Sequence, residues 1–240
     1  MSEGQHFEVP PKSNDPQSIE TLLERGEIES IEHLKGYWGI QLVKIKDDGD
    51  AFFRPDDRTD YQFEARGMKI SRSDLELMAY KIDQVLEFNL VPAVVNRVVG
   101  NSKGSLQRRI QNFQVPPIDW ETEVELEEIK RAAIFDYILD VRDRHHGNFL
   151  IGSDARKLWL IDHDSDMFFG GMTGSRVIDK AEEQGLSILS EAETIALKRF
   201  LEQADPLAIG AKPEIVEIIK KAQDRTKILL KEGRIPTTKT

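Results

Sequence analysis

The first half of the chain consists of short apolar runs separated by polar or glycine-containing segments. Three of these runs are rich in Ile, Leu, Val and Phe, and they span residues 28–34, 40–45 and 51–54. Runs of this length and composition predict β-strands, and Pro55 ends the third because proline cannot donate to a strand ladder. Ahead of them, Ser18 can cap a short helix over residues 19–25, which Gly26 ends. The pattern predicts a small sheet preceded by one helix.

A longer segment has helical rather than strand periodicity. Apolar side chains recur every three or four positions over residues 74–87, which predicts an amphipathic helix. The charged stretch before it, residues 55–70, is expected to be an irregular connecting loop. After it, residues 94–99 and 106–113 predict a hairpin around a glycine-containing turn.

Glu76, in the first turn of this predicted helix, has two interpretations. With Ser73 it has the spacing of a capping box, in which its carboxylate accepts a hydrogen bond from the backbone of Ser73. Alternatively, its side chain contacts a strand cation or a metal ion in a functional site. The spacing alone leaves both interpretations open.

The second half of the chain has helical patterns on either side of one predicted hairpin. A helix is expected over residues 125–140, and later helices are expected after the capping-box pair Ser190 and Glu193 and after Pro213. Between them, two short apolar runs flank a polar turn, which is typical of a β-hairpin. These runs span residues 149–151 and 158–161.

The boundaries of these patterns divide the chain into lobes. The segment Val115-Pro116-Pro117 is the best candidate for a linker. We therefore expect an N-lobe, a C-lobe and a flexible stretch at each end. These segments span residues 1–17 (tail), 18–115 (N-lobe), 116–235 (C-lobe) and 236–240 (end).

Polar side chains with catalytic potential lie where the long helix meets the predicted hairpin. Asp143 and Asn148 are five residues apart in the sequence Asp-Arg-His-His-Gly-Asn, and Asp162 follows the second strand. Antiparallel pairing places the residue before the first strand opposite the residue after the second, so we expect Asn148 and Asp162 side by side. Phosphoryl transfer on a kinase scaffold needs one carboxylate facing the attacking hydroxyl, with an amide and a second carboxylate on a metal ion.

The turn between the first two predicted strands contains Gly36 and Gly39. Glycines let a backbone pass close to phosphate oxygens without interference from side chains. An ordinary hairpin turn explains the same two residues, so a phosphate-binding loop and a simple turn are both open.

Composition narrows the class of protein. The chain has 240 residues, a net charge of −10 and no cysteine. The acidic balance argues against a nucleic-acid partner, and the lack of cysteine excludes disulfides and thiolate metal sites. No apolar run approaches the length of a membrane span, and the N-terminus lacks the pattern of a secretory signal. We expect a cytoplasmic protein without a transmembrane segment.

Several segments together resemble one group of atypical kinases. Residues 76–92, 103–106, 134–138 and 143–146 are similar to blocks of the Golgi casein kinase and four-jointed family. Residues 143–148 also resemble the catalytic loop of phosphatidylinositol 3/4-kinase-like proteins, including bacterial members. The resemblance covers roughly residues 28–200. Because the secreted relatives contain disulfides and this chain has no cysteine, an intracellular, bacterial-type member fits better.

This resemblance implies an α+β, two-lobed protein-kinase-like fold. The N-lobe would be small and mostly β with one helix, and the larger, mostly α C-lobe would carry the catalytic loop and a β-hairpin. ATP and Mg²⁺ or Mn²⁺ are the implied cofactors. By position, Asp143 resembles the catalytic aspartate that orients or deprotonates the acceptor hydroxyl, whereas Asn148 and Asp162 resemble the metal ligands. Glu76 resembles the helix glutamate of the site, and residues 35–39 would be the phosphate-covering loop.

One position departs from the family pattern. Arg54 stands where the third strand should carry a phosphate-pairing lysine. Arginine keeps the charge and can bind phosphate through two nitrogens, but its planar head and longer reach differ from those of lysine. Either Arg54 fulfils this role, or Lys44 or Lys69 replaces it. A third option is a protein that binds nucleotide without efficient transfer.

Three functions are therefore open. The first is a kinase that transfers the γ-phosphate of ATP to a hydroxyl on a protein, a lipid or a small molecule, with a protein acceptor favoured. The second is a pseudokinase or interaction module, motivated by Arg54. The third is a metal-dependent phosphohydrolase, because some side chains in the second half could supply nitrogen and oxygen ligands. These candidate ligands are His145, His146, His163 and Asp164.

Overall fold

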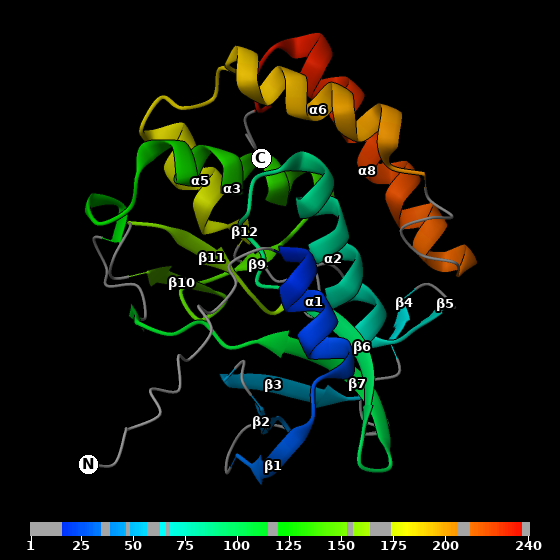
Figure 1. The fold of residues 1–240 in the computed structure, drawn as a ribbon. Coiled ribbons are helices and arrows are strands. Elements are labelled where there is room, and N and C mark those ends of the chain that lie inside the picture. Colours follow the sequence, from blue (N-terminus) through cyan, green and yellow to red (C-terminus); the bar gives the residue numbers. More distant parts are fainter. Residues whose placement is uncertain are drawn as a thin grey trace, which may run out of the picture.

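A five-stranded antiparallel sheet dominates the N-terminal part of the computed structural model (Figure 1). The structure describes residues 16–34, 39–46, 49–56, 63–65, 68–114, 120–152, 156–163, 174–205 and 212–236. In spatial order the strands are β1 (Ile28–His33), β2 (Gln41–Ile45), β3 (Gly49–Pro55), β7 (Ser102–Arg108) and β6 (Val94–Val99). The three early strands and the later hairpin predicted from the sequence thus join in one sheet.

Strand β3 is central to this sheet and alternates between its two faces. Ala51 and Phe53 are fully buried, whereas Phe52 and Arg54 are partly exposed on the other face, as the two-residue period of a strand requires. Arg54 pairs with Ser105 of β7, and the next pair includes Gly104. A Cβ at Gly104 would lie 2.1 Å from the carbonyl oxygen of Arg54, so only glycine lets β7 approach the backbone at this point.

Two helices pack on the sheet (Figure 1). Helix α1 (Pro16–Arg25) begins before the predicted residue 19, and α2 (Arg72–Leu86) matches the predicted helix within two residues. The guanidinium of Arg97 in β6 donates to the carbonyls of Leu23 and Gly26 at 2.8 and 2.7 Å, which caps the end of α1. Lys81 of α2 donates to Glu20 of α1 at 2.9 Å.

The predicted capping box of α2 is displaced by two residues. Ser71, not Ser73, is the N-cap: its side chain accepts from the backbone of Asp74, whose carboxylate accepts from the backbone of Ser71. Ser73 instead donates its hydroxyl to Asp56 at 2.7 Å. The capping interpretation of Glu76 is therefore wrong, because Asp74 occupies that role.

Two further strand predictions need correction. Residues 55–70 are not irregular throughout, because β4 (Phe63–Ala65) and β5 (Met68–Ile70) form a short antiparallel hairpin there. In the β6–β7 hairpin the chain turns at residues 100–101, so the second strand spans Ser102–Arg108 instead of residues 106–113. Gly104 lies within β7, although glycine in the sequence suggested that it belonged to the turn.

The C-terminal part is mostly helical around the buried helix α3 (Leu126–Leu139). The other helices are α5 (Arg176–Glu183), α6 (Glu191–Gln203) and α8 (Pro213–Glu232), with a short 3-10 helix at Trp120–Thr122. Helix α3 packs against α5 and α8, and α6 contacts α2 of the N-terminal part. The predicted capping box of Ser190 and Glu193 is confirmed at the start of α6.

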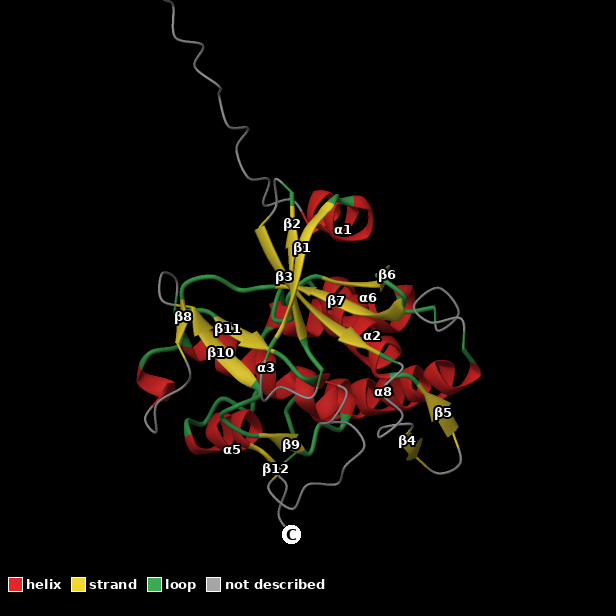
Figure 2. Ribbon diagram, turned by 90° about the horizontal axis from the view of Figure 1, so that it is seen from below, coloured by secondary structure: helices red, strands yellow, loops and turns green. Residues whose placement is uncertain are grey.

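The predicted hairpin in the second half is also confirmed. Strands β10 (Phe149–Gly152) and β11 (Leu158–Leu160) pair antiparallel, and β8 (Phe113–Gln114) adds to the other edge of β10. Figure 2 shows this small sheet as a group of strands separate from the five-stranded sheet. Strand β9 (Asp143–Arg144), which precedes this hairpin in the sequence, pairs in parallel with β12 (Gly174–Ser175), which follows it.

One hydrophobic core extends through both parts, because the buried apolar side chains of the sheet, α2, α3, the small hairpin and α8 form a single cluster. Among the helices that the structure describes, none is long and apolar enough to cross a membrane. The predicted tail up to residue 15, the linker at 115–117 and the last four residues lie outside the described residues.

Candidate active site

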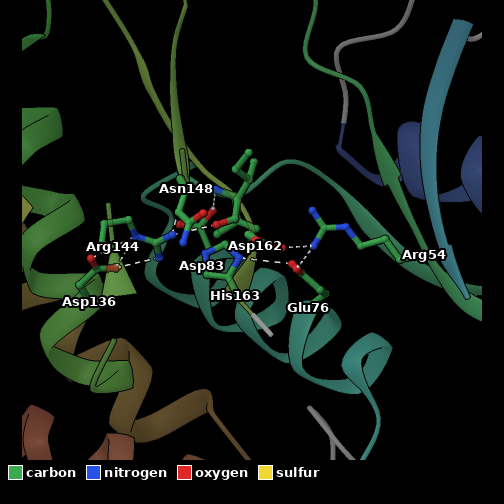
Figure 3. Close-up of polar contacts among 10 residues, drawn as sticks. Arg54, Glu76, Asp83, Asp136, Arg144, Asn148, Asp162 and His163 are labelled. Atoms are coloured by element: carbon green, nitrogen blue, oxygen red, sulfur yellow. Dashed lines mark hydrogen bonds and ion pairs between the residues drawn. The ribbon is translucent and has the colours of Figure 1, made fainter. Parts of the chain in front are cut away.

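A cation and two carboxylates meet where the five-stranded sheet, α2 and the end of β11 come together (Figure 3). The guanidinium nitrogen Nη1 of Arg54 donates to Glu76 Oε1 at 2.7 Å and to Asp162 Oδ1 at 2.6 Å. The side chains of Arg54 and Glu76 are 12% and 2% exposed, whereas Asp162 is 31% exposed. Asp162 is therefore the most solvent-exposed member of this cluster.

Glu76 is held through both carboxylate oxygens. Oε1 accepts from Arg54, and Oε2 lies 3.3 Å from Nδ1 of His163, whose side chain is fully buried. Burial alone would raise the pKa of Glu76, but the Arg54 charge and the His163 bond outweigh it and lower that pKa. Burial lowers the pKa of His163, so the ring is neutral beside an ionised Glu76.

The structure distinguishes two of the three candidate cations, Arg54 and Lys44. Arg54 of β3 reaches the helix glutamate, as expected for the strand cation of a kinase-like site. Lys44 does not join this cluster, because its ammonium lies 3.2 Å from Glu29 and its side chain is 59% exposed. The backbone of Lys69 lies in β5, and its side chain is outside the described residues.

The structure describes only part of the turn that contains Gly36 and Gly39. The hairpin around it is confirmed: β1 pairs with β2, and Leu34 donates its N–H to the carbonyl of Ile40 at 3.1 Å. Gly39 has a φ of 81°, in the left-handed region that favours glycine. Gly36 lies outside the described residues, so the phosphate-binding role of the turn stays a prediction.

The buried guanidinium of Arg144 fixes the segment of residues 143–148. Its Nε and Nη2 donate to the buried carboxylate of Asp136 on α3, with a shortest distance of 3.0 Å. Its Nη1 donates to the carbonyls of Asn148 and Ile161 at 2.9 and 2.8 Å, so one side chain binds the residue before β10 and the residue after β11. Ser175 donates its hydroxyl to the same Asp136 carboxylate at 2.7 Å. These contacts show that Arg144 shapes the 143–148 segment.

Asn148 and Asp162 lie at the same end of the hairpin (Figure 3). Because β11 ends at Leu160, Asn148 pairs with Ile161, whose N–H donates to the Asn148 carbonyl at 3.0 Å, and Asp162 follows directly. The side-chain nitrogen Nδ2 of Asn148 donates to the carbonyl of Asp143 at 2.9 Å, which connects two of the three predicted residues. The register thus differs by one residue from the expected pairing.

Asp162 has an unusual backbone conformation. Its φ is 63°, in the left-handed region that non-glycine residues rarely adopt, although Asp and Asn tolerate it better than most. Strained residues of this kind concentrate at functional sites. The chemistry of the pair also fits a hard divalent ion: an Asn amide oxygen and an Asp carboxylate are the oxygen donors that Mg²⁺ and Mn²⁺ prefer.

The histidines do not converge as the phosphohydrolase hypothesis requires. His163 is buried against Glu76, and His145 accepts a hydrogen bond on Nδ1 from the backbone of Gly147 at 2.9 Å. His146 contacts the ring of Phe149, with centroids 6.0 Å apart. Asp164 lies outside the described residues. Within the described part of the chain, no group of three or more His, Cys, Asp or Glu side chains is arranged to hold a metal.

Two residues of the site were not predicted from the sequence as members of it. Asp136 has the helical spacing of a core residue on α3, and nothing local indicates that Arg144 will pair with it. His163 was considered only as a metal ligand, yet its partner is 87 positions away in the sequence. The one signal in the sequence was the position of His163, directly after Asp162.

Comparisons with known proteins agree on the fold. A crystal structure of the Golgi casein kinase superposes with a TM-score of 0.59 at 15% identity, covering 95% of this chain and 80% of that one. A Golgi casein kinase structure with Mn and ADP bound gives 0.57 at 15% identity, with coverages of 90% and 74%. Hydra Fam20 with sugar gives 0.59 at 13% identity, with coverages of 90% and 88%. No protein-family model and no curated protein sequence matches the chain.

These similarities establish the class of architecture. The chain has a two-lobed kinase-like fold, with the five-stranded sheet and α2 in the N-lobe and the β10–β11 hairpin and remaining helices in the C-lobe. Arg54, Glu76 and Asp162 lie where the two lobes meet.

Proposed function

We propose that the protein is an ATP-dependent kinase that transfers the γ-phosphate to a hydroxyl group. The observation that supports this most directly is the contact of Arg54 with Glu76 and Asp162, which joins a strand cation, a helix carboxylate and a hairpin carboxylate between the lobes. This is the arrangement that kinases use to hold nucleotide phosphates and their metal. The Golgi casein kinase structure with Mn and ADP bound supports the same cofactor class.

Each residue of the site has a defined task in this proposal. Asp143 accepts a hydrogen bond or a proton from the acceptor hydroxyl and so directs its oxygen at the γ-phosphate. Arg54, held by Glu76, binds the phosphates of the nucleotide through guanidinium N–H groups. Asn148 and Asp162 hold the divalent ion, which, when bound, neutralises charge on the phosphates. Catalysis then rests on positioning and electrostatic stabilisation, with no covalent intermediate on the protein.

The finer assignments belong to the same proposal. The acceptor is a hydroxyl on a protein, lipid or small molecule, with protein favoured, and Mg²⁺ or Mn²⁺ serves as the ion. A bacterial-type, cytoplasmic member of the phosphatidylinositol 3/4-kinase-like group remains our prediction from the sequence. The phosphate-covering role of Gly36 and Gly39 belongs to the same proposal.

A thermal shift and a transfer assay test the proposal. ATP with Mg²⁺ or Mn²⁺ at a hundred times its dissociation constant should stabilise the protein by about 2.7 kcal/mol. Labelled ATP should then transfer phosphate to the protein itself or to a mixture of protein acceptors. Asp162→Asn should abolish transfer, whereas Asp224→Asn, on the exposed face of α8, should leave it unchanged. The absence of a shift with either ion would contradict the proposal, as would unchanged transfer by Asp162→Asn.

The pseudokinase alternative makes a separate prediction, because Arg54 departs from the lysine of the family. If arginine has degraded the enzyme, Arg54→Lys should raise transfer strongly. In the structure, however, Arg54 already reaches both Glu76 and Asp162 within 2.7 Å. A lysine is a compact point charge without the planar fork of arginine. We therefore expect Arg54→Lys to lower kcat/KM; a large gain would favour the pseudokinase.

A further inference from the structure

Four residues of the site form a closed ring of contacts. Arg54 binds both Glu76 and Asp162, Glu76 contacts His163, and His163 is joined to Asp162 by a peptide bond. The ring therefore connects three elements, namely β3, α2 and the segment after β11 (Figure 3). Any movement of one of these elements alters the contacts of the other two.

The contact between Glu76 and His163 completes the hydrogen bonding of a deeply buried carboxylate. Glu76 is 2% exposed, and an ionised group at this depth is costly unless its oxygens accept hydrogen bonds. Arg54 donates to Oε1, and the ring N–H of His163 faces Oε2 as its donor. This geometry requires the neutral tautomer of His163 that carries its proton on Nδ1.

The ring of His163 is also held in place. It is fully buried and lies edge-on to Phe135 of α3, with centroids 5.8 Å apart and an interplanar angle of 81°. Its Nε2 is buried without a hydrogen-bond partner among the described residues, so Glu76 is the polar contact that orients the ring there. The backbone at Asp162 cannot rotate to redirect its carboxylate without withdrawing His163 from Glu76.

We infer that His163 is a positioning residue that couples the metal ligand Asp162 to the phosphate-binding cation Arg54 through Glu76. This inference rests on the proposed kinase function. Asp162 would hold the divalent ion with a fixed backbone at residues 162–163, and His163 would then hold Glu76 in the orientation that presents Arg54 to phosphate. Nucleotide and ion thus strengthen each other's binding through this residue, in addition to their direct contact.

Two substitutions separate the hydrogen bond from the packing of the ring. His163→Phe keeps an aromatic ring against Phe135 but removes the donor. His163→Asn keeps an N–H two bonds beyond Cβ, where Nδ1 of histidine lies, and so should rescue the contact. His33→Phe, at an exposed position on β1, is the matched control.

The decisive measurement is the affinity for Mn²⁺, read by electron paramagnetic resonance, with and without ADP. Hydrogen bonds to charged groups correspond to roughly a tenfold or larger effect, so His163→Phe should reduce the mutual strengthening of Mn²⁺ and ADP binding about tenfold. His163→Asn should restore most of it, and His33→Phe should match the wild type. For transfer, we expect His163→Phe to raise the KM for ATP more than it lowers kcat.

A second measurement does not depend on turnover. Nitrogen NMR of ring-labelled wild-type protein should show the buried histidine protonated on Nδ1 and not on Nε2. Protonation on Nε2 would overturn the inference. So would a mutual strengthening of Mn²⁺ and ADP binding that is the same in His163→Phe and the wild type. An equal loss of this strengthening in His163→Phe and His163→Asn would overturn it as well. If the wild type binds neither Mn²⁺ nor ADP, the kinase proposal itself fails; an Nδ1-protonated ring would then report only a structural bond.

Discussion

Asp83 should make the stability of the protein depend on pH in the direction opposite to that of an ordinary carboxylate. It lies on α2, is 1% exposed, and accepts the backbone N–H of Val91 on Oδ2 at 2.9 Å. Its Oδ1 is buried without a hydrogen-bond partner among the described residues. Burial raises the pKa of Asp83 to about 7, although the backbone bonds from Val91 and Leu90 and the charge of Lys157 oppose the rise.

The sign of the effect follows from proton binding. The folded pKa is raised above the ordinary value of 3.8, so between about pH 4 and 7 the folded protein holds a proton that the unfolded chain releases. The contribution to the free energy of unfolding is full below pH 3.8 and is lost as the pH rises to about 7. A difference of about three pH units corresponds to about 4 kcal/mol at 1.36 kcal/mol per unit.

Asp83→Asn isolates this contribution. The amide cannot ionise, yet its oxygen can still accept from Val91, and the charges that face the site, Lys157 and Glu128, are unchanged. Urea unfolding of both proteins at pH 5, 6, 7 and 8 gives the free energies. From pH 5 to pH 8 the wild type should lose about 3 kcal/mol relative to Asp83→Asn. Parallel stability profiles for the two proteins would refute the reasoning.

Two further predictions concern residues that hold the site in place. Arg144→Ala leaves the carboxylate of Asp136 buried without its cation, so urea unfolding should show a loss of about 3–5 kcal/mol; wild-type stability would contradict the role of this pair. Gly104→Ala would place a Cβ 2.1 Å from the carbonyl oxygen of Arg54, so calorimetry should show weaker ATP binding. At Gly152 the nearest atom would be 3.6 Å away, so Gly152→Ala should bind ATP like the wild type, and equal binding by both variants would contradict the prediction.

Elements with a strong periodic pattern could be predicted from the sequence. The helix over α2 and the β10–β11 hairpin follow from residues close together in the chain, and hairpin pairing alone brings Asn148 near Asp162. The cap of α2 shows the limit of such patterns. Ser71 with Asp74 and Ser73 with Glu76 have the same spacing, and the choice depends on Asp56, which binds the Ser73 hydroxyl from another element.

The contacts between distant elements could not be predicted. Arg54 meets Asp162 across 108 positions of sequence, and local pattern carries no information about which cation crosses that distance. Lys44 was one alternative, and only the structure shows that its ammonium lies beside Glu29. Likewise, the sequence cannot tell a buried arginine from an exposed loop arginine. Only the folded structure shows that Arg144 is buried and surrounded by hydrogen-bond acceptors.

The two buried acids of α2 explain why the segment around Asp162 is held so firmly. Glu76 and Asp83 are seven residues apart, so they lie on the same face of the helix. Glu76 is ionised because a cation and a ring N–H serve it, whereas the pKa of Asp83 is raised by burial beside backbone donors. Glu76 contacts His163, the residue after Asp162. Asp83 accepts the N–H of Val91, and the neighbouring Leu90 carbonyl accepts the N–H of Leu160, two residues before Asp162. Helix α2 is thus fixed to the chain on both sides of Asp162, so its position and that of the proposed metal ligand must change together.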